Sequence, residues 1–451
     1  MADDNPTTTA DNSKRDAVKQ QIENDIAKAQ EWTIQDEDIE AARSLIGIDT
    51  ASSAGELSWN GPVSEAGVKR WTYSIGDDNP LYWDPNYALG TRWGQQIAPG
   101  SMAQILHSGM MGDPMDPDLA KRTRSLFRGI HVFVAGSDKY WYKPLFVGDS
   151  LHGYGGTAAV DVKPSEFAGR SVIRYNRRVN LNQRGEVAFI ARGRAIHTER
   201  KAATEKGKYS AIEPAVYTDE DIARIDEIYA NEKRRGGEPR YFEDTNVGDK
   251  MPEYAKGPLT VTELIVFHGG GYGVTDGYRI GGSREWHKNR KRIRNFYIKD
   301  DFGVPDVSQR VHWNSEWARK IGNPMAYDYS VMRESWLHHY LTDWVGDDGW
   351  VFRQYDEVRK FNYMGDVQFL SGEVVNKRFE DGHCFVDLMI RTTNQRDTVT
   401  TIGEATVILP SREHGPVILP EPPRAEKVKA TEMWKRHNEL LREKGFKKYL
   451  P

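Results

Sequence analysis

The chain has 451 residues, which is too long for one hydrophobic core and predicts two or three domains. Its 62 basic and 66 acidic residues leave a net charge of −4, so no overall field favours nucleic acid. No apolar run approaches the roughly 20 residues that cross a bilayer, and no secretory signal begins the chain. The single cysteine, Cys384, excludes an internal disulfide framework and a cysteine-rich metal site. Together these features predict a soluble, cytoplasmic protein.

The first 54 residues predict a polar tail followed by a helical extension. Residues 1 to about 12 have the composition of a disordered segment. Good helix formers then run from Ser13 to Trp32 and from Asp36 to Ile46. We expect these helices to pack against the rest of the chain and to carry no chemistry.

A turn rich in polar residues follows the next predicted helix, Val63 to Ile75. Gly76 ends that helix, and Asp77-Asp78-Asn79-Pro80 predicts a tight turn. The segment 101–111, after Pro99 and Gly100, predicts a largely buried helix whose first amides point back toward the turn. A carboxylate facing a helix start suits a site where a carbonyl oxygen gains negative charge.

Predicted strands fill the remainder of the first half. They cover residues 126–146, 151–162, 171–181 and 187–198, with a hairpin turn at Asn182 to Gly185. A charged linker with a short helix spans 201–240. A tail with a basic helix, 413–451, ends the chain.

The second half repeats the first in the same order, which indicates a tandem duplication. Three pairs of motifs correspond: Gly148-Asp149 with Gly365-Asp366, Asn182-Gln183-Arg184 with Asn394-Gln395-Arg396, and Tyr82-Trp83 with His312-Trp313. The repeat boundaries place the two units at 55–200 and 241–412. An insertion, 276–310, interrupts the second unit.

Residues Gly76 to Leu81, with Pro99 and Gly100 downstream, resemble the signature of the MaoC-like R-specific enoyl-CoA hydratases, Gly-Asp-x-Asn-Pro-Leu followed by His. The resemblance covers about residues 55 to 412. It implies an α+β double hot-dog fold, in which each unit is a long helix wrapped by an antiparallel sheet. It also implies reversible hydration of a 2-enoyl-CoA to a 3-hydroxyacyl-CoA. No cofactor is expected beyond coenzyme A in the substrate, and the chain is expected to form a homodimer or higher oligomer.

Neither half carries the full set of residues that the resemblance implies. The first keeps Asp77 but has Tyr82 where the family has its catalytic histidine. The second keeps the histidine, His312, but its nearest upstream carboxylate, Asp306, is one position out of register. Asp328 occupies the position of the helix-start glycine. Two alternatives stay open: catalysis by Asp77 with Tyr82 or a neighbouring histidine, and catalysis by Asp306 with His312. The second is favoured because histidine titrates near neutral pH.

The substrate-binding candidates lie in two places. Asn79 is expected to brace the turn, and Gly100 and Ser101 are expected to lie beside the thioester. A basic run inside the insertion, Arg279 to Lys299, includes Arg290, Lys291 and Arg292. Such a run is ordinarily a solvated face, but its position makes it a candidate for binding the phosphates of coenzyme A.

The histidines are scattered without metal-ligand spacing, so no metal is predicted. For His131, and for at least one of His338 and His339, a structural role is expected. Two alternatives to a hydratase remain. One is a hot-dog acyl-CoA thioesterase, and the other is a non-catalytic partner subunit of a hydratase.

Overall fold

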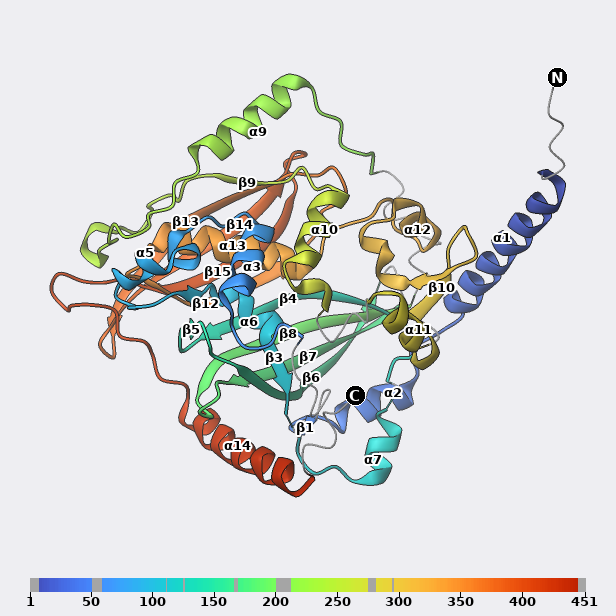
Figure 1. The fold of residues 1–451 in the computed structure, drawn as a ribbon, viewed down its shortest axis with the longest axis horizontal. Helices are drawn as coiled ribbons and strands as arrows, with labels where there is room; N and C mark the ends of the chain where they lie inside the picture. Colours follow the sequence, from blue (N-terminus) through green and yellow to red (C-terminus); the bar gives the residue numbers. More distant parts are fainter. Residues whose placement is uncertain are drawn as a thin grey trace.

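The computed structural model describes residues 8–50, 59–110, 112–124, 126–165, 169–199, 212–274, 281–293 and 296–444. An N-terminal extension precedes two α+β units, and a helix closes the chain (Figure 1). The extension contains α1 (Thr8–Gln30), α2 (Asp36–Arg43) and β1 (Asp49–Thr50). Helix α1 begins before Ser13, so the expectation of disorder up to residue 12 is wrong for residues 8–12.

The first unit contains α3 (Glu65–Ile75), α4 (Pro80–Trp83), α5 (Pro85–Leu89), β2 (Ile97–Ala98), η1 (Gly100–Met102), α6 (Ala103–Leu106), β3 (His107–Gly109), α7 (Pro117–Arg122), β4 (His131–Trp141), β5 (Leu145–Phe146), β6 (Leu151–Ser165), β7 (Gly169–Leu181) and β8 (Val187–Thr198). The connector contains α9 (Asp219–Asn231) and η2 (Phe242–Asp244).

The second unit contains β9 (Tyr254–Lys256), α10 (Val261–Gly269), η3 (Tyr272–Val274), α11 (Ser283–Arg292), β10 (Tyr297–Lys299), β11 (Pro305–Val307), η5 (Ser308–His312), α12 (Ser315–Lys320), α13 (Ser330–Val345), β12 (Trp350–Val358), β13 (Gln368–Glu380), β14 (His383–Asn394) and β15 (Val399–Ile408). Helix α14 (Arg424–Lys444) follows.

A single sheet runs through both units. Its strand order is β1-β6-β7-β8-β4-β12-β15-β14-β13-β9, with β3 attached to β6. Strands β4 and β12 pair antiparallel, from Tyr140 opposite Arg353 to Gly136 opposite Glu357. The predicted double hot-dog architecture with continuous sheets is therefore confirmed.

The central helices of the two units differ in length. Helix α13 is buried along most of its 16 residues, as expected for the helix that a hot-dog sheet wraps. In the first unit the helix ends at Leu106, so the helix expected over 101–111 is too long. The Asn60 side chain donates to Ile105 O, and β3 then pairs in parallel with β6. These contacts satisfy backbone groups that a longer helix would have used. Met111 lies outside the described residues.

Where the two units meet, four polar side chains are buried. Lys139 of β4 forms an ion pair with Glu334 of α13, and both are 3% exposed. Ser137 Oγ lies 3.2 Å from Glu334 and 3.4 Å from Asp356 of β12. Burial, reinforced by Glu334, raises the pKa of Asp356 well above its ordinary value. One lysine therefore balances Glu334, while Asp356 keeps its proton to higher pH than an ordinary aspartate.

Within the described residues, no helix has both the length and the hydropathy that a membrane-spanning segment needs.

The ion pair at this junction gives a stability prediction. Lys139→Met leaves the buried carboxylate of Glu334 without its cation, and we expect it to lower the free energy of unfolding by about 3–5 kcal/mol. Adding Glu334→Leu removes the stranded charge and should recover most of the loss. The measurement is urea unfolding of the single and double variants.

Lys250→Met is the matched control, because Lys250 pairs with Glu373 at the surface and is 71% exposed. Its cost should stay within about 1 kcal/mol. Equal losses in the two lysine variants would contradict a special role for the junction.

Candidate active site between the two units

The polar turn after α3 is built by its own side chains. Gly76 ends the helix in the left-handed region, at φ 72°, where a side chain would be strained. Asp77 Oδ1 accepts from Asn79 N at 3.1 Å, and Asn79 Oδ1 accepts from Leu81 N at 3.0 Å. Asn79 Nδ2 donates to Asp347 Oδ1, just after α13, at 2.9 Å. Asn79 thus braces the turn, as expected, and also fastens it to the second unit.

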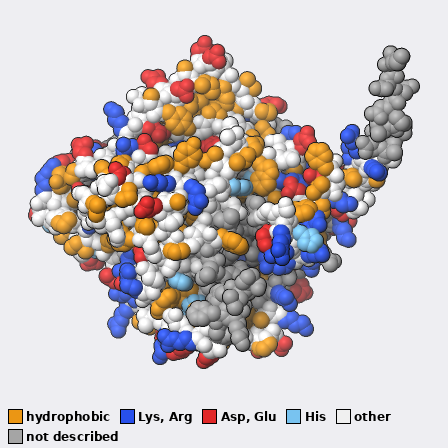
Figure 2. Space-filling model, viewed as in Figure 1, with side chains coloured by type: hydrophobic (Ala, Val, Ile, Leu, Met, Phe, Trp, Pro, Cys, Tyr) orange, Lys and Arg blue, Asp and Glu red, His pale blue; other side chains and the backbone are white. Residues whose placement is uncertain are grey.

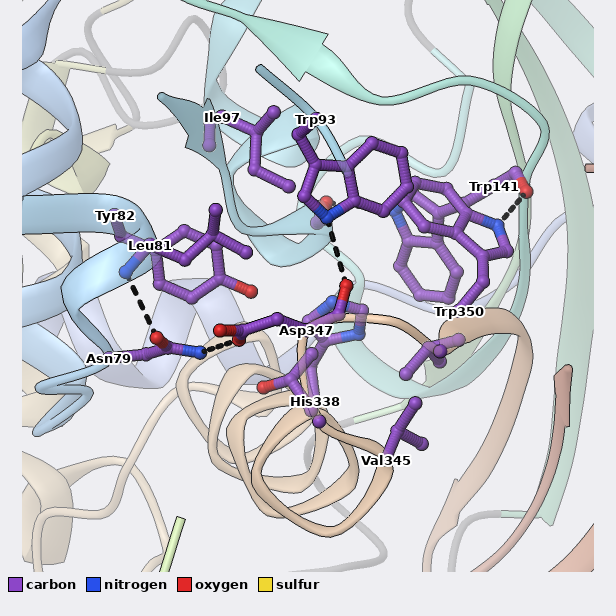
Figure 3. Close-up of a pocket in the computed structure, with 16 residues that line it drawn as sticks. Asn79, Leu81, Tyr82, Trp93, Ile97, Trp141, His338, Val345, Asp347 and Trp350 are labelled. Carbon is purple, nitrogen blue, oxygen red and sulfur yellow. Dashed lines mark hydrogen bonds between the residues drawn. The ribbon is translucent and has the colours of Figure 1, made fainter. Parts of the chain in front are cut away.

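A cavity of about 40 Å³ lies between the turn and α13 (Figure 3). The turn and the start of the short first-unit helix contribute Asn79, Tyr82 and Gly100, and the ring of Tyr82 extends toward the middle of the space. The other lining residues are Leu81, Trp93, Ile97, Ala98, Trp141, His338, Thr342, Val345, Gly346, Asp347, Gly349, Trp350 and Val351. Both units therefore form its wall.

The space beside Gly100 is already occupied. A Cβ at this position would stand 2.7 Å from Trp141 Nε1 and 2.8 Å from His338 Nε2. Trp141 Nε1 also donates to Gly100 O at 2.8 Å. Because glycine has no side chain, the rings of Trp141 and His338 can pack directly against Gly100. Ser101 is buried, and its Oγ accepts from Trp71 Nε1 at 3.1 Å. Ser101 is not among the residues that line the cavity.

Behind the turn, Asp77 faces a buried group that sequence reasoning missed. One carboxylate oxygen from each of Asp77 and Asp343, and one ring nitrogen of His339, lie within 4.8 Å of one another. His339 Nε2 is 3.1 Å from Asp343 Oδ2, and its Nδ1 is 3.0 Å from Lys256 Nζ. The spacing of His339 and Asp343, four residues apart on one helix face, was the available signal.

This group holds a proton more readily than a metal ion. The Lys256 ammonium occupies the lone pair on Nδ1 of His339, so Nε2 carries the hydrogen that it donates to Asp343. Asp77 Oδ2 and Asp343 Oδ1 have no hydrogen-bond partner in the described part of the chain. Burial raises the pKa of Asp77 to about 6, and the charge of Asp343 adds to that rise. Protonation of Asp77 would relieve the repulsion between its carboxylate and that of Asp343.

Comparison with known proteins shows which family model and which solved structures the chain resembles. Residues 54–191 match the family model described as the FAS1-like dehydratase domain region. A solved MaoC-like dehydratase superposes with a TM-score of 0.53 at 15% identity, covering 82% of this chain and 99% of its own. The chain therefore has the double hot-dog fold, and its first unit matches a dehydratase-domain model.

Two more solved structures share lower similarity. The putative MaoC domain protein dehydratase from Chloroflexus aurantiacus has 12% identity and a TM-score of 0.48, covering 81% of this chain and 96% of its own. A Mycobacterium tuberculosis protein described as having a double hotdog fold has 10% identity and a TM-score of 0.42, covering 79% and 96%. No curated protein matches the sequence at a significant level.

In the second unit, the two predicted catalytic residues have separate surroundings. His312 is half-buried, its Nδ1 lies 2.9 Å from Tyr327 O, and its ring centre is 3.9 Å from that of Tyr329. Burial lowers the pKa of His312 to about 4. Asp306 lies on β11 with its side chain 38% exposed, 3.7 Å from Arg310. Among the described residues, no hydrogen bond joins Asp306 to His312.

The carboxylate of Asp328, just before α13, is paired with neighbouring side chains. Arg333 donates to both of its oxygens, at 3.0 and 2.7 Å, and Asn362 Nδ2 donates at 3.2 Å. The carboxylate is therefore turned toward Arg333 and neutralised there.

Part of the basic run forms the surface helix α11. Lys and Arg side chains gather over α11 (Figure 2). Lys291 and Arg292 are exposed, and Arg290 lies over the ring of Trp286, 4.0 Å from its centre. None of the three lines the cavity. Arg279 and Arg294 lie outside the described residues. His131 is half-buried on β4 and stacks on Phe133, with the ring centres 4.2 Å apart.

The buried carboxyl group of Asp77 gives a pH prediction. Its pKa is about 6 in the folded chain against an ordinary 3.8, so the folded state binds the proton more tightly. Folding stability should therefore fall as pH rises from about 4 to 6, by on the order of 3 kcal/mol. Asp77→Asn removes the titration and keeps the oxygen that accepts from Asn79 N.

We expect Asp77→Asn to gain stability relative to the wild-type chain as pH rises from 4 to 7. Unfolding midpoints of both proteins across this range are the measurement. A difference that does not change with pH would show that Asp77 titrates normally.

Proposed function

We propose that the chain catalyses reversible addition of water to a 2-enoyl-CoA, giving a 3-hydroxyacyl-CoA, in the cavity between the two units. The observation that carries the proposal is the shared cavity wall of Asn79, Tyr82 and Gly100. These residues come from the hydratase-like turn and from the start of the short first-unit helix. The family model for a dehydratase domain covers the same segment.

Tyr82 supplies the acid. Burial, followed by the charges of Asp77, Asp347 and Asp343, raises its pKa well above the ordinary value of 10.0. The phenol is therefore neutral at physiological pH and holds a proton. As water attacks C3, the developing enolate needs a proton at C2, and Tyr82 is the proposed donor.

Substrate entry requires the cavity to open. A volume of about 40 Å³ holds one or two water molecules but no acyl chain. Trp93 and Trp350 are partly exposed, and their ring centres are 5.5 Å apart. Displacement of these two rings gives the acyl chain a route from the surface.

The first test compares the two units directly. Tyr82→Phe removes one hydroxyl and should lower kcat for hydration of an enoyl-CoA by roughly 100-fold. His312→Gln in the same assay should change kcat by less than about threefold. The measurement is loss of enoyl-thioester absorbance by the purified chain.

A parallel assay measures the free thiol that the chain releases from a saturated acyl-CoA. Thiol release without hydration would identify a thioesterase, and inactivity on both substrates would favour a partner subunit. Loss of hydration in His312→Gln alone would move the chemistry to the second unit, with Asp306 tested next as Asp306→Asn.

A second test concerns the CoA part of the substrate. We propose that Arg290, Lys291 and Arg292 of α11 bind its phosphates. Changing all three to Ala should raise KM several-fold for CoA thioesters and leave pantetheine thioesters unaffected, with a larger effect at low salt. Equal effects on both kinds of thioester would contradict phosphate binding.

A further inference from the structure

Hydration also requires a group that takes a proton from water, and the first unit lacks the histidine that the resemblance implies. We propose that His338, on α13 of the second unit, is this base and that Gln354 on β12 fixes its tautomer. The inference rests on the proposed hydration and identifies residues from the opposite unit as part of its site.

His338 reaches the cavity at the right place. It is one of the lining residues, together with Tyr82 and Gly100. Its Nε2 lies 2.8 Å from the point where a side chain at Gly100 would begin, and its ring packs on Trp141 with centres 4.6 Å apart. This packing holds the edge of the imidazole toward the cavity. Tyr82 faces the same cavity from the opposite wall.

Gln354 determines which nitrogen carries the hydrogen. Gln354 Nε2 donates to the backbone oxygen of Glu334 at 2.9 Å, which sets the orientation of the amide. Its Oε1 then lies 3.2 Å from Nδ1 of His338 and can only accept. Nδ1 therefore carries the hydrogen, and Nε2 presents a lone pair beside Gly100.

The neighbouring histidine does not fill this role. His339 points into the group behind the turn, where Asp343 and Lys256 occupy its two nitrogens. It is not among the cavity-lining residues. Of the two adjacent histidines on α13, His338 alone offers a lone pair to the cavity.

Charge and proton balance are consistent with the step. Burial lowers the pKa of His338 to about 3, so the ring is neutral at pH 7. Nε2 takes a proton from water while the oxygen bonds to C3, and the C2–C3 electron pair moves into the thioester enolate. Tyr82 then protonates C2, and the imidazolium returns a proton to the phenolate. The enolate and the cavity-lining Asp347 offset the transient positive charge.

The kinetic test uses the full chain with a 2-enoyl-CoA. His338→Gln should lower kcat at least 100-fold with KM changed less than threefold. His437→Gln is the control, because His437 is also buried but lies on α14 against His152, with ring centres 6.2 Å apart. The control should keep wild-type kinetics.

Gln354 is tested through the pH profile, which a merely structural role would not move. Gln354→Glu keeps an acceptor toward Nδ1 and adds a negative charge, so the acidic limb of kcat/KM should shift to higher pH. Gln354→Leu should lower kcat by about tenfold. The Glu variant also covers the case in which His338→Gln fails to fold.

The outcomes separate the two proposals. If the wild-type chain hydrates the substrate and His338→Gln keeps kcat within threefold, the role of His338 is overturned and the hydratase stands. An unshifted acidic limb in Gln354→Glu overturns the positioning role. A wild-type chain without hydration overturns the proposed function itself.

Discussion

The antiparallel pairing of β4 with β12 makes the two units one structure. It joins two sheets into a continuous layer and brings Lys139 of β4 against Glu334 of α13. Without this contact the carboxylate of Glu334 would be buried without a cation, at a cost of several kcal/mol. Because α13 is anchored here, the pairing also fixes where the later turns of α13 meet the first unit. The cavity and the buried group of Asp77, His339 and Asp343 both lie at that contact.

Two faces of helix α13 contribute side chains to two different sites, the cavity and the buried group around Asp77. His338 and Thr342, four residues apart, line the cavity, whereas His339 and Asp343 on the next face meet Asp77. A buried polar side chain without a partner costs about 1–3 kcal/mol, so a helix this polar needs partners for most of its side chains. Glu334 bonds to β4, His338 bonds to β12, and His339 and Asp343 bond to β9. The same bonds that satisfy the helix therefore orient the side chains proposed to act on the substrate.

Local signals predicted the parts of the structure that local contacts build. The Gly76 helix end, the Asn79 brace and the repeated hairpins each depend on residues a few positions apart. The early end of the first-unit helix was missed because it depends on a distant residue. Asn60, which donates to the carbonyl of Ile105, lies 45 positions before it in the chain. The position of His338 was missed for the same reason, since its neighbours Gly100 and Trp141 belong to the other unit. Asp306 and His312 remain a prediction, although their surroundings in the structure are separate.

The tyrosine at position 82 has a physical explanation in this setting. Burial, followed by the charges of Asp77, Asp347 and Asp343, raises the pKa of the phenol. A tyrosine there keeps its proton and remains a donor at neutral pH. The base then has to come from another residue, and His338, oriented by the neutral amide of Gln354, lies on the opposite wall. The exchange of histidine for tyrosine thus separates acid and base onto two units.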